Sequence, residues 1–244
     1  MKVVILSDGK PGHFNQSIGV ANIISEEVEV DYKIFNIEPK FKFLIKYYQR
    51  YLARDFNKRK AKKIISLFKP IEIQNFDLLI SSGANTSFLS AAFSKIYHIK
   101  NIHIGSIKKI NLCNYSAHIT VDPRHDSPNN IFTRIAPTRF KPSKASKKDK
   151  KNRSLFLIGG DGAGYKYTLK DWHVLVKGIK ALFEARNVRP IIVTSRRTKT
   201  SHEKFLYNEL IDYADDLSVW FSKGNCKLDL EKLFMSVDNI FVTE

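Results

Sequence analysis

The apolar residues of the chain fall into short runs separated by longer amphipathic segments. Runs such as VVIL at residues 3–6 and LFLI at residues 155–158 are typical of strands buried on both faces of a parallel sheet. The segments between them carry apolar residues three and four positions apart, which is the spacing of helices that bury one face. Alternation of the two patterns predicts an α/β protein with doubly wound, mainly parallel sheets.

In the first half of the chain we expect strands and helices to alternate up to about residue 135. Strands are predicted at residues 3–6, 28–35, 78–81, 102–105, 119–121 and 131–135. Helices are predicted at residues 14–26, over much of 41–68, and at 86–97. Together they predict an N-terminal Rossmann-like domain over residues 1–138.

A second α/β unit is expected after a basic linker at residues 139–153, because prolines and lysines in that stretch are typical of an exposed connection. Strands are predicted at residues 155–158, 190–194, 217–221 and 239–243, and helices at residues 169–185, 201–214 and 228–236. The C-terminal domain, residues 154–244, therefore repeats the plan of the first: strand, glycine-rich turn, helix.

The net charge of +17 is concentrated in two stretches. Residues 40–69 hold eleven Lys or Arg and one acid, residues 139–153 hold eight and one, and the remaining chain has 22 basic and 22 acidic residues. Charge confined to two local elements indicates an anionic partner. Two widely separated cysteines and an N-terminus that begins directly in a strand, without a signal peptide, predict a cytoplasmic protein or one peripheral to the cytosolic face of a membrane.

The basic segment at residues 40–69 is expected to form one long helix with tyrosines at helical spacing among its cations. Such a helix suits an anionic membrane surface. A helix packed on its own sheet, with a solvated basic face, fits the pattern equally well. Nucleic acid is disfavoured because no nucleic-acid-binding motif accompanies the charge. The cations predicted to contact anionic lipid are Lys46, Arg50, Arg54, Lys58, Arg59 and Lys62.

A polar turn, SDGKPGHFNQ at residues 7–16, separates the first predicted strand from the first helix. Gly9 and Gly12 allow backbone conformations that other residues resist, and the turn lies at the carboxyl end of a strand, where open α/β sheets bind ligands. Imidazole titrates near neutrality, so His13 suits a general base that removes a hydroxyl proton. A hydrogen bond from His13 to a phosphate or a turn carbonyl is the alternative. The polar residues of this candidate site are Asp8, Lys10, His13, Asn15 and Gln16.

A second glycine-rich loop, GGDGAG at residues 159–164, follows the first strand of the second half. Backbone N–H groups in such a loop, with the dipole of the next helix, are suited to binding a diphosphate. The glycine spacing matches neither a dinucleotide-binding fingerprint nor a P-loop, so it indicates neither NAD nor an ATPase site. An ordinary glycine-rich turn is the alternative. The candidate phosphate ligands are Gly159, Gly160 and Gly162, joined by Ser195, Arg196 and Arg197 after the next strand.

Four segments taken in order resemble the ELM family of mitochondrial fission proteins and its bacterial relatives. They are DGKPGHFNQ at residues 8–16, LIGG at 157–160, TSRRT at 194–198 and VTE at 242–244. The resemblance implies two Rossmann-like domains facing a cleft, as in GT-B glycosyltransferases, with a nucleotide sugar bound mainly by the C-terminal domain. Family members continue beyond the last segment, so the resemblance also implies that the C-terminal domain is incomplete in this chain.

The resemblance implies an inverting glycosyltransferase that moves a sugar from a nucleotide-diphosphate sugar to a membrane-associated acceptor, without a metal or any other cofactor. His13 would be the base, Asp8 and Asn15 would orient it or the acceptor, and Gly12 and Gln16 would complete the substrate-binding turn. The glycine loop and Arg196, helped by Arg197, would hold the diphosphate, with Thr243 and Glu244 near the nucleoside or sugar. A non-catalytic membrane adaptor or fission factor with the same fold is the alternative; the sequence does not predict the oligomeric state.

Overall fold

The structure is a computed structural model of the 244-residue chain, and it describes residues 1–41, 45–52, 54–107, 110–122, 127–140, 153–162, 164–224 and 229–243. The chain divides into two compact units, Met1–Lys141 and Pro142–Glu244. Most of the basic linker predicted at residues 139–153 lies outside the described residues. Each unit is built on its own parallel sheet.

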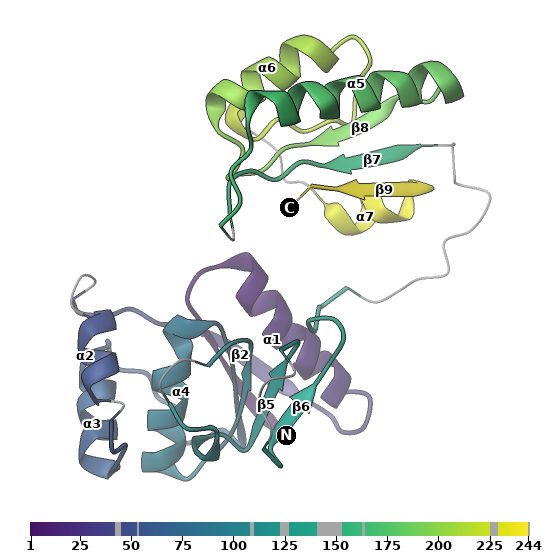
Figure 1. Ribbon diagram of the computed structural model, residues 1–244. Coiled ribbons are helices and arrows are strands. Elements are labelled where there is room, and N and C mark those ends of the chain that lie inside the picture. Colours follow the sequence, from purple (N-terminus) through teal and green to yellow (C-terminus); the bar gives the residue numbers. More distant parts are fainter. Residues whose placement is uncertain are drawn as a thin grey trace. The chain divides into compact units, whose positions relative to one another are not determined.

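The first unit contains a six-stranded parallel sheet with strand order β2-β1-β3-β4-β5-β6 (Figure 1). Every strand predicted in the first half is present, with its ends shifted by a few residues. The strands are β1 (Lys2–Ser7), β2 (Asp31–Asn36), β3 (Leu78–Ser82), β4 (Lys100–Ile104), β5 (Ala117–Thr120) and β6 (Asn130–Phe132).

Alternate residues of the central strands build two cores, one on each face of this sheet. Val3 and Ile5 face α1 (Pro11–Ile24), whereas Val4 and Leu6 face α3 (Lys58–Ser66) and α4 (Ala84–Tyr97). Figure 1 shows α1 on one side of the sheet and the other helices on the opposite side. Both faces are covered, which explains why these strands are continuous apolar runs.

The basic segment forms two short helices, so the prediction of one long helix over residues 41–68 was wrong. The helices are α2 (Ile45–Leu52) and α3. Between them Asp55 adopts a left-handed conformation with φ 48°, and the Asn57 side chain accepts a hydrogen bond from the Lys60 N–H at 3.0 Å. Asn57 is thus an N-cap, and a new helix begins there with its own axis.

The second unit contains a three-stranded parallel sheet with strand order β8-β7-β9. Its strands are β7 (Ser154–Leu157), β8 (Pro190–Val193) and β9 (Asn239–Val242), and its helices are α5 (Leu169–Arg186), α6 (Thr200–Leu210) and α7 (Leu230–Met235). Within this unit α5 and α6 cover one face of the sheet and α7 the other (Figure 1).

The strand predicted at residues 217–221 is reduced to a single bridge between Val193 and Val219. Two side chains end the pairing: the Thr194 hydroxyl accepts the Phe221 N–H at 2.8 Å, and the Glu203 carboxylate accepts the Ser222 N–H at 2.9 Å. The chain then enters a short 3-10 helix, Phe221–Lys223. None of the described helices combines the length and the apolar character that crossing a membrane requires.

Candidate functional site

The strand order of the first unit places a ligand-binding position between β1 and β3. From β1 the chain crosses to β2 on one side and then to β3 on the other, so the carboxyl ends of β1 and β3 form a topological switch point. Such switch points open a crevice at the carboxyl edge of α/β sheets. The predicted turn at residues 7–16 follows β1, and the N-terminus of α4 follows β3.

Asp8 and His13 form a carboxylate–imidazole pair at this switch point. His13 Nδ1 lies 3.0 Å and 3.1 Å from the two carboxylate oxygens of Asp8. Only 3% of the Asp8 side chain is exposed, against 30% for His13. An imidazole that donates from Nδ1 to a buried carboxylate keeps its lone pair at Nε2. Among the described residues His13 Nε2 has no hydrogen-bond partner, so it is available as a proton acceptor.

Asp8 is held in its ionised form by donors from both sides of the switch point. The Asn85 amide donates to the carboxylate at 3.0 Å from α4, and the Lys10 N–H donates at 3.3 Å from the turn. Burial alone would raise the pKa of Asp8, but the hydrogen bond and charge of His13, together with the two other donors, hold the pKa below its ordinary value. Asp8 therefore acts as a fixed negative charge that orients His13.

Gly83 provides the space that the His13 ring occupies. It is the N-cap residue of α4 with φ +83°, and a Cβ placed there would overlap with the imidazole. Neither Gly83 nor Asn85 is among the site residues predicted from the sequence. Their signal was present, because SSGAN at residues 81–85 repeats the strand–glycine–helix pattern of the first turn.

The other residues predicted in the first turn have more modest roles. α1 begins at Pro11, three residues before the predicted start, so Gly12 lies in its first turn without positive φ, and a Cβ added there would meet no atom within 4 Å. Gln16 accepts a hydrogen bond from the Ser82 hydroxyl at 2.5 Å, which links α1 to the end of β3. Asn15 Oδ1 is buried and without a partner in the described part of the chain.

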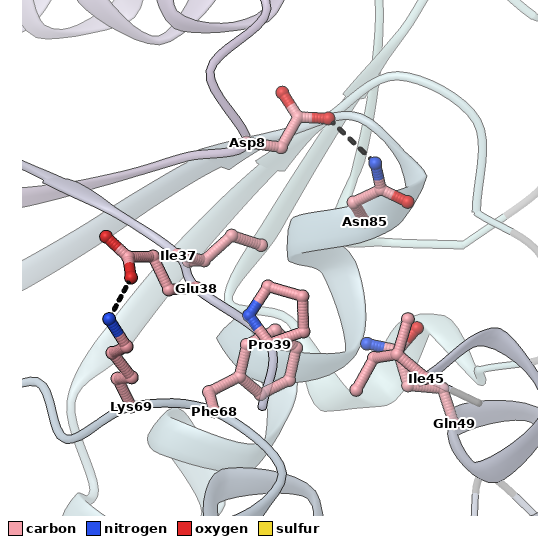
Figure 2. Close-up of a pocket in the computed structure, with 9 residues that line it drawn as sticks. All are labelled: Asp8, Ile37, Glu38, Pro39, Ile45, Gln49, Phe68, Lys69 and Asn85. Atoms are coloured by element: carbon pink, nitrogen blue, oxygen red, sulfur yellow. Dashed lines mark hydrogen bonds and ion pairs between the residues drawn. The ribbon is translucent and has the colours of Figure 1, made fainter. Parts of the chain in front are cut away.

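A pocket of about 700 Å³ opens beside Asp8 and Asn85 (Figure 2). Its other walls come from the segment after β2, from Phe68 and Lys69 after α3, and from Ile45 and Gln49 on α2. The volume is in the range of small-molecule sites. The pocket extends from the Asp8 side of the Asp8–His13 pair.

The second unit has an equivalent switch point between β7 and β9. The Gly159 N–H donates to the Thr243 hydroxyl at 2.9 Å, and the Thr198 hydroxyl donates to the Gly159 carbonyl at 2.7 Å. Residues that follow three different strands therefore meet in one place. Glu244, predicted beside Thr243, lies outside the described residues.

Two N–H groups of the glycine loop are already used inside the protein. Gly159 donates to Thr243, and Gly162 donates to the Tyr165 carbonyl at 3.1 Å. Gly160 packs so closely against the main chain of Arg197 that a Cβ there would overlap with the Arg197 carbonyl. Within the described residues, the N–H groups of Gly160 and Asp161 have no partner, and these are the donors left for a ligand.

Cations gather around the glycine loop. Arg196 and Arg197 are exposed at the end of β8, and Arg197 Nη1 lies 2.7 Å from the position of a Cβ at Gly162. Lys199 Nζ forms an ion pair with Asp161 at 2.8 Å, and the hydrogen bond from Lys199 lowers the pKa of Asp161. Ser195, by contrast, accepts the Arg197 N–H at 3.2 Å and shapes the turn.

The basic segment exposes aromatic side chains as well as cations. Tyr47 is 76% exposed and Tyr51 65% exposed on α2, whereas Leu52 beside them is buried. The tyrosines are therefore not the packing stripe that a helix buried on its sheet would need. Five of the six predicted lipid-binding cations are exposed: Arg50, Arg54, Lys58, Arg59 and Lys62. The Lys46 side chain is outside what the structure describes.

The buried histidines of the first sheet are structural. His103 Nδ1 lies 2.9 Å from the Ser81 hydroxyl, and burial lowers the pKa of His103 to about 3, with smaller contributions from the charges of His118 and His13. His103 therefore stays neutral. In the described ranges no three His, Cys, Asp or Glu side chains gather as metal ligands would.

Comparisons with known proteins agree with this architecture. Over 99% of its length the chain superposes on Staphylococcus aureus MnaA in complex with UDP, with 9% sequence identity, a TM-score of 0.51 and 73% of that chain covered. It also matches the UDP-GlcNAc 2-epimerase of Neisseria meningitidis bound to UDP-GlcNAc, with 11% identity, a TM-score of 0.50, and 99% and 77% of the two chains covered. At such identities the likeness shows the fold alone, and it confirms the predicted α/β class of GT-B type.

The sequence comparisons place the chain in a family. A search of curated proteins gives no significant match. The model of the family described as mitochondrial fission ELM1 matches residues 11–244, which include all or part of each of the four segments on which the resemblance was based. The chain belongs to the mitochondrial fission ELM1 family.

Proposed function

We propose that this protein is a GT-B-type glycosyltransferase that uses a nucleotide-diphosphate sugar and a hydroxyl-bearing, membrane-associated acceptor. The observation that carries the proposal is the Asp8–His13 pair, whose Nδ1–carboxylate distance of 3.0 Å leaves Nε2 as the proton acceptor. In the proposed step Nε2 takes the acceptor hydroxyl proton, and the oxygen forms a bond to the anomeric carbon. The bond from that carbon to the diphosphate oxygen breaks, and the nucleoside diphosphate leaves with the electron pair, which inverts the anomeric configuration.

The donor side of the proposal rests on the second unit. The free N–H groups of Gly160 and Asp161, with Arg196 and Arg197, are suited to stabilising the charge that develops on a leaving diphosphate. UDP is the ligand in the Staphylococcus aureus structure, and UDP-GlcNAc in the Neisseria meningitidis structure. This likeness supports a uridine nucleotide as the first donor to test.

Calorimetric titration with UDP tests the donor site. We expect wild type to bind UDP and His13→Ala to bind it with the same affinity. Arg196→Ala should raise the dissociation constant about tenfold, which is equivalent to about 1.4 kcal/mol. Arg189→Ala is the matched control, because Arg189 is exposed at the opposite end of the same strand. Absence of UDP, GDP and ADP binding to wild type at millimolar concentration would remove the donor site and the proposal with it.

A second candidate function is a non-catalytic membrane adaptor, in keeping with the fission role in the family's name. The exposed Tyr47 and Tyr51 among the cations of α2 and α3 favour it. The two candidates differ at His13: a transferase loses turnover in His13→Ala, whereas an adaptor retains its full function.

A further inference from the structure

We propose that the pocket beside Asp8 and Asn85 binds a neutral sugar ring of the acceptor in preference to a phosphorylated one. This inference rests on the proposed function, since it names the chemical class of the group whose hydroxyl His13 would deprotonate. The pocket lies entirely within the first unit, and its walls come from five separate parts of that unit (Figure 2).

Two chain segments fix the apolar wall of the pocket. Residues 38–40 pair with residues 67–69 through the hydrogen bonds from the Lys40 N–H to the Leu67 carbonyl and from the Lys69 N–H to the Glu38 carbonyl, both 2.9 Å long. This pairing sets Pro39 against Phe68. Ile37 and Ile45 extend the apolar surface (Figure 2). A sugar ring has an apolar face of C–H groups that packs on such a surface.

Gln49 provides the observation that points to a ligand. Only 4% of this residue is exposed, yet it lines the pocket, and its amide has no hydrogen-bond partner among the described residues. A side-chain amide that lines a pocket and has no partner in the protein is free to form hydrogen bonds with a bound ligand. An amide both donates and accepts, which matches hydroxyl groups, because each hydroxyl also does both.

The charges around the pocket select against anions. Its lining carries two carboxylates, Asp8 and Glu38, and one cation, Lys69, whose Nζ is 2.5 Å from the Glu38 carboxylate. Lys10 lies outside the lining and is itself 3.7 Å from Asp8. Carboxylates accept hydrogen bonds from hydroxyls but repel phosphates. Phosphate binding is better served by the exposed arginines beside the glycine loop of the second unit.

Ligand-observed NMR on the full chain tests the inference with methyl β-glucopyranoside and its 6-phosphate as probes. We expect the neutral glycoside to bind and the phosphate to bind about tenfold more weakly or not at all. Gln49→Leu keeps the size of the side chain and removes only its polar atoms. This substitution should weaken the glycoside about tenfold while leaving the thermal unfolding midpoint unchanged or raised.

Gln74→Leu is the matched control, because Gln74 is exposed near the opposite end of β3 and should leave binding unchanged. Should Gln49→Leu not fold, the side-chain amide resonance of Gln49 in labelled wild type gives the same answer, since the glycoside should shift it. Equal binding of the 6-phosphate, wild-type affinity in a folded Gln49→Leu, or an unmoved Gln49 resonance would overturn the inference.

The two proposals fail separately. If the glycoside does not bind while UDP does, the pocket inference falls and the proposed donor site stands. If the glycoside binds and UDP does not, the pocket stands as a sugar site, and the transferase proposal falls.

Discussion

At the scale of single residues, the chemistry of the candidate site depends on Asp8 remaining ionised. Its pKa is lowered by His13, Asn85 and the Lys10 N–H, which outweigh the opposing effect of burial. A carboxyl group whose pKa is lower in the folded than in the unfolded protein stabilises the fold at pH values above its ordinary pKa of 3.8. This contribution is lost as the pH falls through the pKa of the folded protein.

We therefore expect the wild type and Asp8→Asn to differ most in free energy of unfolding at neutral pH. The difference should shrink as the pH falls below about 4, because the unfolded protein then takes up a proton at Asp8 that the folded protein binds only at lower pH. Urea unfolding of both proteins from pH 7 to pH 3 measures it. A difference that stays constant over this range would show that the carboxylate is not stabilised by its neighbours.

Gly83 offers a second test at the residue scale, with Gly105 as its control. Both glycines follow neighbouring strands and have positive φ, +83° and +97°, so alanine strains the backbone at either position by about 1–3 kcal/mol. Only at Gly83 would the new Cβ also overlap with the His13 ring; at Gly105 it meets no atom within 4 Å.

We expect Gly83→Ala to cost about 1–3 kcal/mol more free energy of unfolding than Gly105→Ala, and to shift the NMR resonances of the His13 ring. Denaturant unfolding and histidine NMR of the two variants provide the comparison. Equal costs together with unchanged His13 ring resonances would mean that the imidazole does not pack against Gly83 in solution.

At the scale of elements, strands β1, β3, β7 and β8 could be predicted from sequence because burial on both faces makes each of them a largely apolar run. The break between α2 and α3 could not, since the cap at Asn57 interrupts a pattern of charges and apolar residues that is otherwise continuous. The strand predicted at residues 217–221 is cut short by contacts with residues distant in sequence. The Thr194 and Glu203 side chains accept the backbone N–H groups that would otherwise pair with a neighbouring strand.

The site was predictable only where its residues are adjacent in sequence. Asp8 and His13 belong to one turn of the chain. Asn85 lies beside Asp8 because β3 is the neighbour of β1, and Gln49 lines the same pocket because of the way α2 packs. The convergence of Gly159, Thr198 and Thr243 likewise depends on β7 lying between β8 and β9, which periodicity does not reveal.

The glycine loop gives a prediction at this scale, because its glycines differ in what surrounds them. At Gly160 a Cβ would meet the main chain of Arg197, which cannot move without disturbing the end of β8. At Gly162 it would meet only the flexible end of the Arg197 side chain, at 2.7 Å from Nη1.

We expect Gly160→Ala to destabilise the fold by about 2 kcal/mol or more, and Gly162→Ala to preserve the unfolding midpoint while altering affinity for UDP. Thermal unfolding and calorimetry separate the two effects. Similar destabilisation by both substitutions would contradict the packing of the loop against Arg197.

At the scale of the whole molecule, the surplus of charge is confined to the basic segment and to the predicted linker, while the remaining chain is balanced. Exposed tyrosines stand among the cations of α2, and α2 also lines the sugar pocket through Ile45 and Gln49. One face of this helix is thus exposed as a candidate membrane surface while another forms part of the pocket beside Asp8 and Asn85. An acceptor anchored in a bilayer would meet both.

Vesicle sedimentation tests the membrane contact. We expect the protein to bind phosphatidylcholine vesicles that contain phosphatidylserine, to bind pure phosphatidylcholine weakly, and to lose binding at high salt, since each cation near an anionic surface contributes about 1 kcal/mol. Charge reversal of Arg50, Lys58 and Lys62 to Glu should abolish binding. The double variant Tyr47→Ala and Tyr51→Ala should reduce binding at any salt concentration, because the aromatic rings contribute apolar burial.

Tyr32→Ala, at an exposed tyrosine on β2 away from the basic segment, is the control and should bind as wild type. If the double tyrosine variant also binds like wild type, the aromatic face of α2 is not a membrane contact, and equal binding to both kinds of vesicle would exclude an electrostatic one.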